Sequence, residues 1–222
     1  MTTSIDGPRL APVGGRATAL VVLVHGYGAN GEDLIGLADA WRGILPAVAF
    51  AAPNAPQTLP FEAVGGFQWF DLTFRDAEEL WRGVRQSGPV LDRFIDAELA
   101  RYRLDSSRVA LVGFSQGTMM ALHIGLRRRP APAAILGYSG IIAGPGHLAA
   151  DRTGWAAGEQ PQILLVHGES DEVIPASALD VTVKSLAAAG VAASWHLSPG
   201  LGHGIDGQGL ELGGRFLSQA LG

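Results

Sequence analysis

The 222-residue chain is predicted to form one α/β domain around a mostly parallel sheet. Short apolar runs rich in β-branched residues alternate with segments of helical periodicity. Several of these runs are apolar throughout, as strands covered by helices on both faces should be. Hydrophobic residues make up 47% of the chain and charged residues 17%, so the chain can bury a large core and is not disordered.

The first expected elements are a strand at 18–25, a helix at 32–42 and a second strand at 47–52. The helix is predicted from the stripe that Leu34, Leu37, Ala38 and Trp41 form at i, i+3, i+4 and i+7. Before them, the polar, Pro- and Gly-containing residues 1–15 are expected to be a loosely ordered N-terminal extension of the 1–222 domain.

The later elements follow the same alternation. Residues 76–102 are predicted to form two helical pieces, because Gly88-Pro89 interrupts them. The segment 115–129 is apolar almost all round, which predicts a buried central helix. Further strands are expected at 108–114, 133–139, 162–167 and 191–197, further helices at 175–189 and 207–221, and loops at 53–68 and 140–161.

Composition excludes several classes of function. The formal net charge of −5 argues against binding a phosphate backbone, and Arg127-Arg128-Arg129 ends a helix, where cations suit the dipole. With no cysteine there are no disulfides, thiolate zinc sites or cysteine nucleophiles. The N-terminus does not resemble a signal peptide, and the longest aliphatic run, 19–24, is too short to span a bilayer. We therefore expect a cytoplasmic protein without stable membrane insertion.

Residues 113–117, Gly-Phe-Ser-Gln-Gly, follow an expected strand and open an expected helix. A serine on such a sharp turn is held in a strained backbone conformation that lifts its hydroxyl above the sheet. Glycines two residues to either side let the strand and the helix approach closely. This context favours Ser115 as a nucleophile over a chance match to a common pattern.

His25-Gly26-Tyr27-Gly28 ends the first strand. Such a turn can aim a backbone N–H at a developing oxyanion, so Tyr27 is the candidate for one donor and Gln116 for the other. Gly26 to Gly31 also fits G-x-G-x-x-G, the dinucleotide fingerprint. That alternative needs a carboxylate about 20 residues on to bind the ribose, and residues 50–54 contain none.

Two further loops complete a catalytic set. Asp171, in the acidic segment 167–172, is the best candidate for a carboxylate that orients a histidine, with Glu169 and Glu172 as alternatives. On its own, the acidic cluster would also suit a helix N-terminus. His203 lies in a glycine-rich loop after the last strand, and its neutral imidazole could take a proton from Ser115. No histidine pair has metal-ligand spacing, so no metal is expected.

Together these motifs resemble the small phospholipase/carboxylesterases of the α/β-hydrolase superfamily, which include the acyl-protein thioesterases. The likeness rests on HGYGANGEDL, APNAPQTLP, QWFDL, GFSQGTMMAL, HGESDEVIP and GLGHGI, from about residue 20 to about residue 206. The order serine, aspartate, histidine is also that of α/β-hydrolases. The resemblance implies an α/β-hydrolase fold, and the short segment between Ser139 and Gln160 leaves little chain for a cap domain.

The resemblance also implies a serine carboxylesterase that hydrolyses small-molecule esters without a cofactor. By position, Ser115, Asp171 and His203 match the triad, and the N–H groups of Tyr27 and Gln116 match the oxyanion donors. Tyr27 replaces the aliphatic residue more usual after His-Gly, and its phenol is expected to narrow or polarise the acyl entrance.

Trp69 matches the aromatic residue of the family's WFD-like segment near the substrate, and with Phe70 it is a candidate substrate contact. Ordinary core packing is the alternative for these aromatic side chains. The alternative functions are an acyl-thioesterase or lysophospholipase that uses the same triad, and a non-catalytic or dinucleotide-binding protein. The sequence leaves the oligomeric state open, a homodimer included.

Overall fold

The computed structural model describes residues 4–59, 66–73, 76–151 and 159–222. Its core is a seven-stranded sheet in the order β1-β3-β2-β6-β7-β8-β9. The antiparallel β1 lies at one edge, and all the other neighbours are parallel, which confirms the predicted mostly parallel sheet. The strands are β1 (Arg9–Leu10), β2 (Ala19–Val24), β3 (Val48–Ala51), β6 (Val109–Phe114), β7 (Ala134–Tyr138), β8 (Gln162–Gly168) and β9 (Ser194–Ser198).

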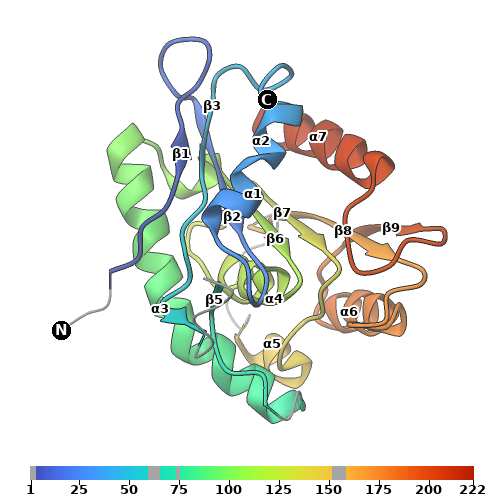
Figure 1. Ribbon diagram of the computed structural model, residues 1–222. Coiled ribbons are helices and arrows are strands. Elements are labelled where there is room, and N and C mark those ends of the chain that lie inside the picture. The colour runs from blue at the N-terminus through green and yellow to red at the C-terminus, as the bar shows by residue number, and fades with distance from the viewer. Residues whose placement is uncertain (1–3, 60–65, 74–75, 152–158) are drawn as a thin grey trace.

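Helices cover both faces of this sheet (Figure 1). One face packs against α3 (Ala77–Tyr102), α4 (Gln116–Gly125), α5 (Pro145–Asp151) and α6 (Ser177–Ala188). The other packs against α1 (Gly31–Ile35), α2 (Leu37–Trp41) and α7 (Gly207–Leu221). Because side chains alternate along a strand, Leu20 and Val22 enter the first core while Val21 and Leu23 enter the second.

Two predicted helices differ in continuity from those observed, and the helix expected at 115–129 ends earlier, at Gly125. The helix expected at 32–42 is divided into α1 and α2 at Gly36, an exposed residue that serves as the C-cap of one and the N-cap of the other. The two pieces expected at 76–102 are one continuous helix, α3, with Pro89 inside it. Pro89 is exposed, so the carbonyl of Arg85, which loses its usual N–H partner, lies on the face open to water.

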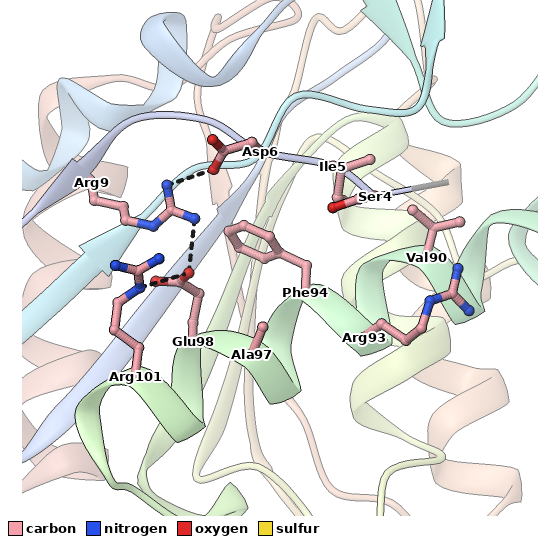
Figure 2. A pocket seen from close by; sticks show the side chains of 10 residues that line it. All are labelled: Ser4, Ile5, Asp6, Arg9, Val90, Arg93, Phe94, Ala97, Glu98 and Arg101. Atoms are coloured by element: carbon pink, nitrogen blue, oxygen red, sulfur yellow. Dashed lines mark hydrogen bonds and ion pairs between the residues drawn. The ribbon is translucent and has the colours of Figure 1, made fainter. Parts of the chain in front are cut away.

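The N-terminal segment is more ordered than expected. In its described part, Arg9 and Leu10 pair with β3, and Arg9 is ion-paired with Asp6 at 2.6 Å and with Glu98 of α3 at 2.8 Å. Arg101 adds a contact with Glu98 at 3.2 Å, and these side chains border a hollow of about 470 Å³ (Figure 2). Charge pairs and strand pairing therefore hold residues 6–10 to the body, a part of the segment 1–15 that was expected to be loosely ordered.

The longer loops carry small elements that the sequence analysis did not predict. The loop at 53–68 contains the antiparallel strand pair of β4 (Gln57–Thr58) and β5 (Phe67–Gln68), and the loop at 140–161 contains α5. In the part of the chain that the structure describes, no helix is both long and apolar enough to cross a bilayer.

Candidate active site

Ser115 sits on the turn between β6 and α4 with φ 55° and ψ −117°, in the left-handed range of φ that costs a side-chain-bearing residue energy. The flanking glycines make this turn sterically feasible. A β-carbon at Gly117 would lie 1.8 Å from the carbonyl oxygen of Val24, and one at Gly113 would lie 2.4 Å from the carbonyl oxygen of Gly117. The predicted strand-turn-helix context of Ser115 is therefore present.

The structure brings two of the predicted side chains into direct contact. Nδ1 of His203 lies 2.7 Å from Oδ2 of Asp171, whose side chain is fully buried. An ionised carboxylate can only accept a hydrogen bond, so Nδ1 of His203 carries the proton. That tautomer leaves Nε2 of His203 as the nitrogen able to take up a proton.

The loops after β8 and β9 are tied together through their backbones. Ser170 N–H donates to the carbonyl of Leu201 at 2.8 Å, and Glu169 N–H donates to the carbonyl of Ser198 at 3.0 Å. A β-carbon at Gly168 would lie 2.2 Å from a carbonyl oxygen of the second loop, so this glycine allows the close approach. Asp171 and His203 are thus held on rigid neighbouring strand ends.

Of the three candidate carboxylates, only Asp171 bonds to His203. The carboxylate of Glu169 accepts from the N–H of Gly200 at 2.9 Å, and the side chain of Glu172 is exposed. The sequence favoured Asp171 but left the other two open, because the contact depends on how two distant loops meet.

The carboxylate of Asp171 is held in its charged form. Burial acts to raise the pKa of Asp171, but hydrogen bonds from His203 and from the N–H groups of Ile174 and Val173 outweigh it, so the pKa lies below its ordinary value of 3.8. The two N–H groups each donate to Oδ1 at 2.9 Å. Asp171 therefore stays ionised at neutral pH.

The turn after β2 approaches the serine closely. A β-carbon at Gly26 would lie 3.2 Å from Cβ of Ser115, which places the next residue, Tyr27, beside the turn that carries Ser115. Within the described residues, no acceptor bonds to the backbone N–H of Tyr27. Gln116 is the first residue of α4, where an N–H has no partner within the helix. Both N–H groups are therefore available to a ligand at Ser115.

Ser115 and His203 share one cavity of about 430 Å³. Its remaining lining is mostly apolar: Tyr27, Leu72, Leu80, Met119, Ile141, Val173, Ile174, Pro175, Ser177, Ala178 and Val181. Tyr27, Val173 and Val181 are exposed large hydrophobic residues, so the rim is apolar as well. The wall formed by residues 173–181 was not predicted from the sequence, although its apolar side chains directly follow Asp171.

Trp69 and Phe70 correct the expectation of substrate contact. Their exposed fractions are 0% and 2%, and neither borders the cavity. Their side chains lie in the core between the sheet and α3, where a β-carbon at Gly83 would lie 2.3 Å from the ring of Phe70. Both side chains are therefore packed in the core, which was the alternative interpretation of this aromatic segment.

The glycines of the dinucleotide-like pattern have packing roles instead. Gly26 lies against Ser115, Gly28 has a φ of 81°, and a β-carbon at Gly31 would lie 2.0 Å from the carbonyl oxygen of Ala52. The helix that follows, α1, is only five residues long. These contacts account for the pattern without a nucleotide.

Two arginines of the basic run that follows α4 are paired internally. Arg127 bonds to Asp151 at 2.9 Å, and Arg128 is ion-paired with Asp92 and with Asp96. These two guanidinium groups are therefore engaged with carboxylates of the same chain.

Comparison with known proteins identifies the family of the chain. The phospholipase/carboxylesterase family model matches residues 6–221. The crystal structure of esterase PE8 superposes with a TM-score of 0.90 at 39% identity, over 98% of this chain and 100% of that chain. Acyl-protein thioesterase 1 of Gibberella zeae is 28% identical over 232 residues, covering 100% of this chain and 98% of that protein. The enzyme of the same name from Schizosaccharomyces pombe is 33% identical over 176 residues, covering 76% of this chain and 75% of that protein. The predicted α/β-hydrolase fold is confirmed, and the chain belongs to the phospholipase/carboxylesterase family.

Proposed function

We propose that this protein is a serine carboxylesterase in which Ser115 is the nucleophile, His203 the general base and Asp171 the residue that orients the base. The observation that carries the proposal is the 2.7 Å contact between His203 and Asp171 at the cavity that also contains the strained Ser115. A nucleophile, a base and a group that orients the base are the parts needed for acyl transfer.

In the first half-reaction, Nε2 of His203 removes the proton of Ser115 as Oγ attacks the ester carbonyl. The N–H groups of Tyr27 and Gln116 bind the oxyanion, and the negative Asp171 stabilises the imidazolium. Collapse of the tetrahedral intermediate expels the alcohol, which takes the proton from His203. In the second half-reaction, water, deprotonated by His203, attacks the acyl-enzyme, and the carboxylic acid and free Ser115 result.

The cavity supports esters with apolar acyl groups of small to medium size. Its apolar lining favours hydrocarbon, and its volume of about 430 Å³ is at the lower end of ordinary small-molecule sites. Rates along a series of p-nitrophenyl esters from acetate to octanoate should therefore rise and then level off or fall as the chain outgrows the cavity.

Active-site labelling tests the proposal directly. A fluorophosphonate should add one adduct, mapped by peptide analysis to Ser115, and Ser115→Ala should lower kcat on the order of 10⁶-fold. Ser107→Ala is the matched control, because Ser107 is an exposed serine on the turn at the opposite end of β6. Wild-type turnover in Ser115→Ala, or an adduct at another residue, would refute the assignment.

A thioesterase activity at the same site is the second candidate. It is favoured by the two relatives named acyl-protein thioesterase 1, one of which aligns with 100% of this chain. The comparison of kcat/KM for oxygen esters and thioesters with the same acyl group separates the two activities. A higher value for the thioester would make the thioesterase activity the main one.

A further inference from the structure

We propose that Trp69, together with the side-chain amide of Gln116, is a positioning residue that holds the two oxyanion-binding N–H groups in the orientation needed to bind the oxyanion. The inference rests on the proposed function and gives a catalytic supporting role to side chains that do not contact the substrate. It follows from a series of buried hydrogen bonds that connects the turn containing Tyr27 with the start of α4, which contains Gln116.

The first half of this series runs from Gln116 to the segment of Trp69. The side-chain oxygen Oε1 of Gln116 accepts from the N–H of Trp69 at 2.9 Å, and its Nε2 donates to the carbonyl of Phe70 at 2.8 Å. Gln116 is completely buried. Both ends of its amide are therefore satisfied by one backbone segment, which fixes that segment against the start of α4.

The second half runs from Trp69 to the turn after β2. The indole Nε1 donates to the carbonyl of His25 at 2.9 Å, and the rings of His25 and Trp69 lie 5.6 Å apart. His25 is followed by Gly26 and then by Tyr27, the other donor. One tryptophan thus bonds to both segments that carry the oxyanion donors.

His25 makes this connection rigid. Its Nε2 accepts from the N–H of Ala55 at 2.9 Å, so the other ring nitrogen, Nδ1, carries the hydrogen and donates to the carbonyl of Gly26 at 2.7 Å. Burial lowers the pKa of His25, which favours this neutral form. Ser87 of α3 adds a hydrogen bond to the carbonyl of Trp69.

The connection matters because the two donors lie on segments far apart in the sequence. An oxyanion is stabilised only by donors that are aimed at it before the reaction, and small displacements of such donors cost rate. Backbone N–H groups cannot be re-aimed by a rotamer change, so the surrounding hydrogen bonds must set their direction. A defect in this network should weaken binding of the transition state more than binding of the ester.

The test compares Trp69→Phe with Trp41→Phe. Trp41 is also buried, with an exposed fraction of 1%, and its indole donates to the carbonyl of Leu210 at 3.0 Å, in the other core. Both substitutions remove one indole hydrogen bond and leave a similar void, so both should lower the melting temperature. Only Trp69→Phe should lower kcat, by about 10-fold or more, with KM changed by less than about twofold.

An alkyl trifluoromethyl ketone, which forms an oxyanion adduct with a serine, supplies the second readout. Its affinity should fall in parallel with kcat in Trp69→Phe and stay at the wild-type level in Trp41→Phe. Gln116→Met, which keeps the length of the side chain but cannot form either hydrogen bond, should reproduce the effect if Trp69→Phe does not fold.

Equal kcat and equal ketone affinity in the folded Trp69 and Gln116 variants and in the wild type would overturn the inference. A loss that is confined to KM would also overturn it, because it would place Trp69 in ester binding. Failure of the proposed function has a different signature, namely wild-type protein that shows no esterase activity and no adduct at Ser115.

Discussion

Nε2 of His167 lies 3.4 Å from Oδ2 of Asp171, the carboxylate oxygen that also faces His203. The same nitrogen is 2.8 Å from the carbonyl oxygen of Ile174. Because a carbonyl can only accept, Nε2 of His167 carries a hydrogen, and that hydrogen points at the turn that closes around the carboxylate. His167 thereby fixes the turn whose N–H groups bind the other oxygen of Asp171.

Replacing His167 should therefore impair catalysis without touching the substrate. His167→Leu removes the donor and should lower kcat by between about 10-fold and 100-fold, well short of the cost of about 10⁴ for disabling the aspartate itself. KM should stay near the wild-type value, because His167 does not border the cavity. Steady-state kinetics on a short-chain p-nitrophenyl ester measure both quantities.

His167→Gln is the matched variant, because its amide N–H can take the place of Nε2. It should recover most of the lost kcat. If Leu and Gln at this position perform alike, the donor is irrelevant and His167 merely fills space.

Asp171 links the site to acid stability. Its pKa is lowered on folding, so ionised Asp171 contributes to stability above the ordinary value of 3.8, and this contribution is lost as pH falls through the lowered pKa. Asp171→Asn lacks that contribution. The difference in free energy of unfolding between wild type and Asp171→Asn should shrink as pH falls below about 4. Urea unfolding at several pH values measures this difference. A difference that stayed constant below pH 4 would show that folding does not lower the pKa of Asp171.

The sequence was informative where a pattern is local. Most strands of the central sheet could be placed because they are short apolar runs, and Ser115, Asp171 and His203 each follow a predicted strand. In parallel sheets these carboxyl ends share one edge, so side chains far apart in the chain meet there. Strand β1 escaped prediction because two residues carry no periodicity.

Features that depend on distant partners could not be predicted. Pro89 is tolerated inside α3 because that position is exposed, and exposure is a property of the folded chain. The aromatic segment around Trp69 indicated a substrate contact, and only the folded chain shows that Trp69 is buried and hydrogen-bonded to His25 and Gln116. The motif around Trp69 indicated that this residue matters for function, but it did not indicate which groups the side chain contacts.

Replacing two glycines, Gly117 and Gly36, by alanine should have opposite effects on the stability of the protein. At Gly117, a β-carbon would lie 1.8 Å from the carbonyl oxygen of Val24, so Gly117→Ala must displace β2 or α4 and should prevent stable folding. At Gly36, φ is −59° and no atom beyond the adjoining backbone lies within 4 Å of a β-carbon, so Gly36→Ala should stabilise the protein by about 0.4–1 kcal/mol by lowering the entropy of the unfolded chain. Thermal melts of both variants test the contrast, and a destabilised Gly36→Ala would contradict it.

His123, buried in α4, should make the protein sensitive to acid. Burial is the main cause that lowers the pKa of His123 to about 3, and the charge of nearby Arg127 adds to the effect. Since the unfolded chain binds this proton near pH 6.5 and the folded chain does not, stability should fall by up to about 1.4 kcal/mol per unit as pH drops from 6.5 towards 3.

His123→Leu removes that proton-binding difference, so its free energy of unfolding should depend less steeply on pH over the same window. Nδ1 of His123 has no hydrogen-bond partner among the described residues, and its loss leaves no donor or acceptor unpaired there. At pH 7 the variant should therefore be at least as stable as the wild type, apart from the packing change against Trp81. Parallel pH slopes for the two proteins in denaturant unfolding would show that another group causes the acid sensitivity.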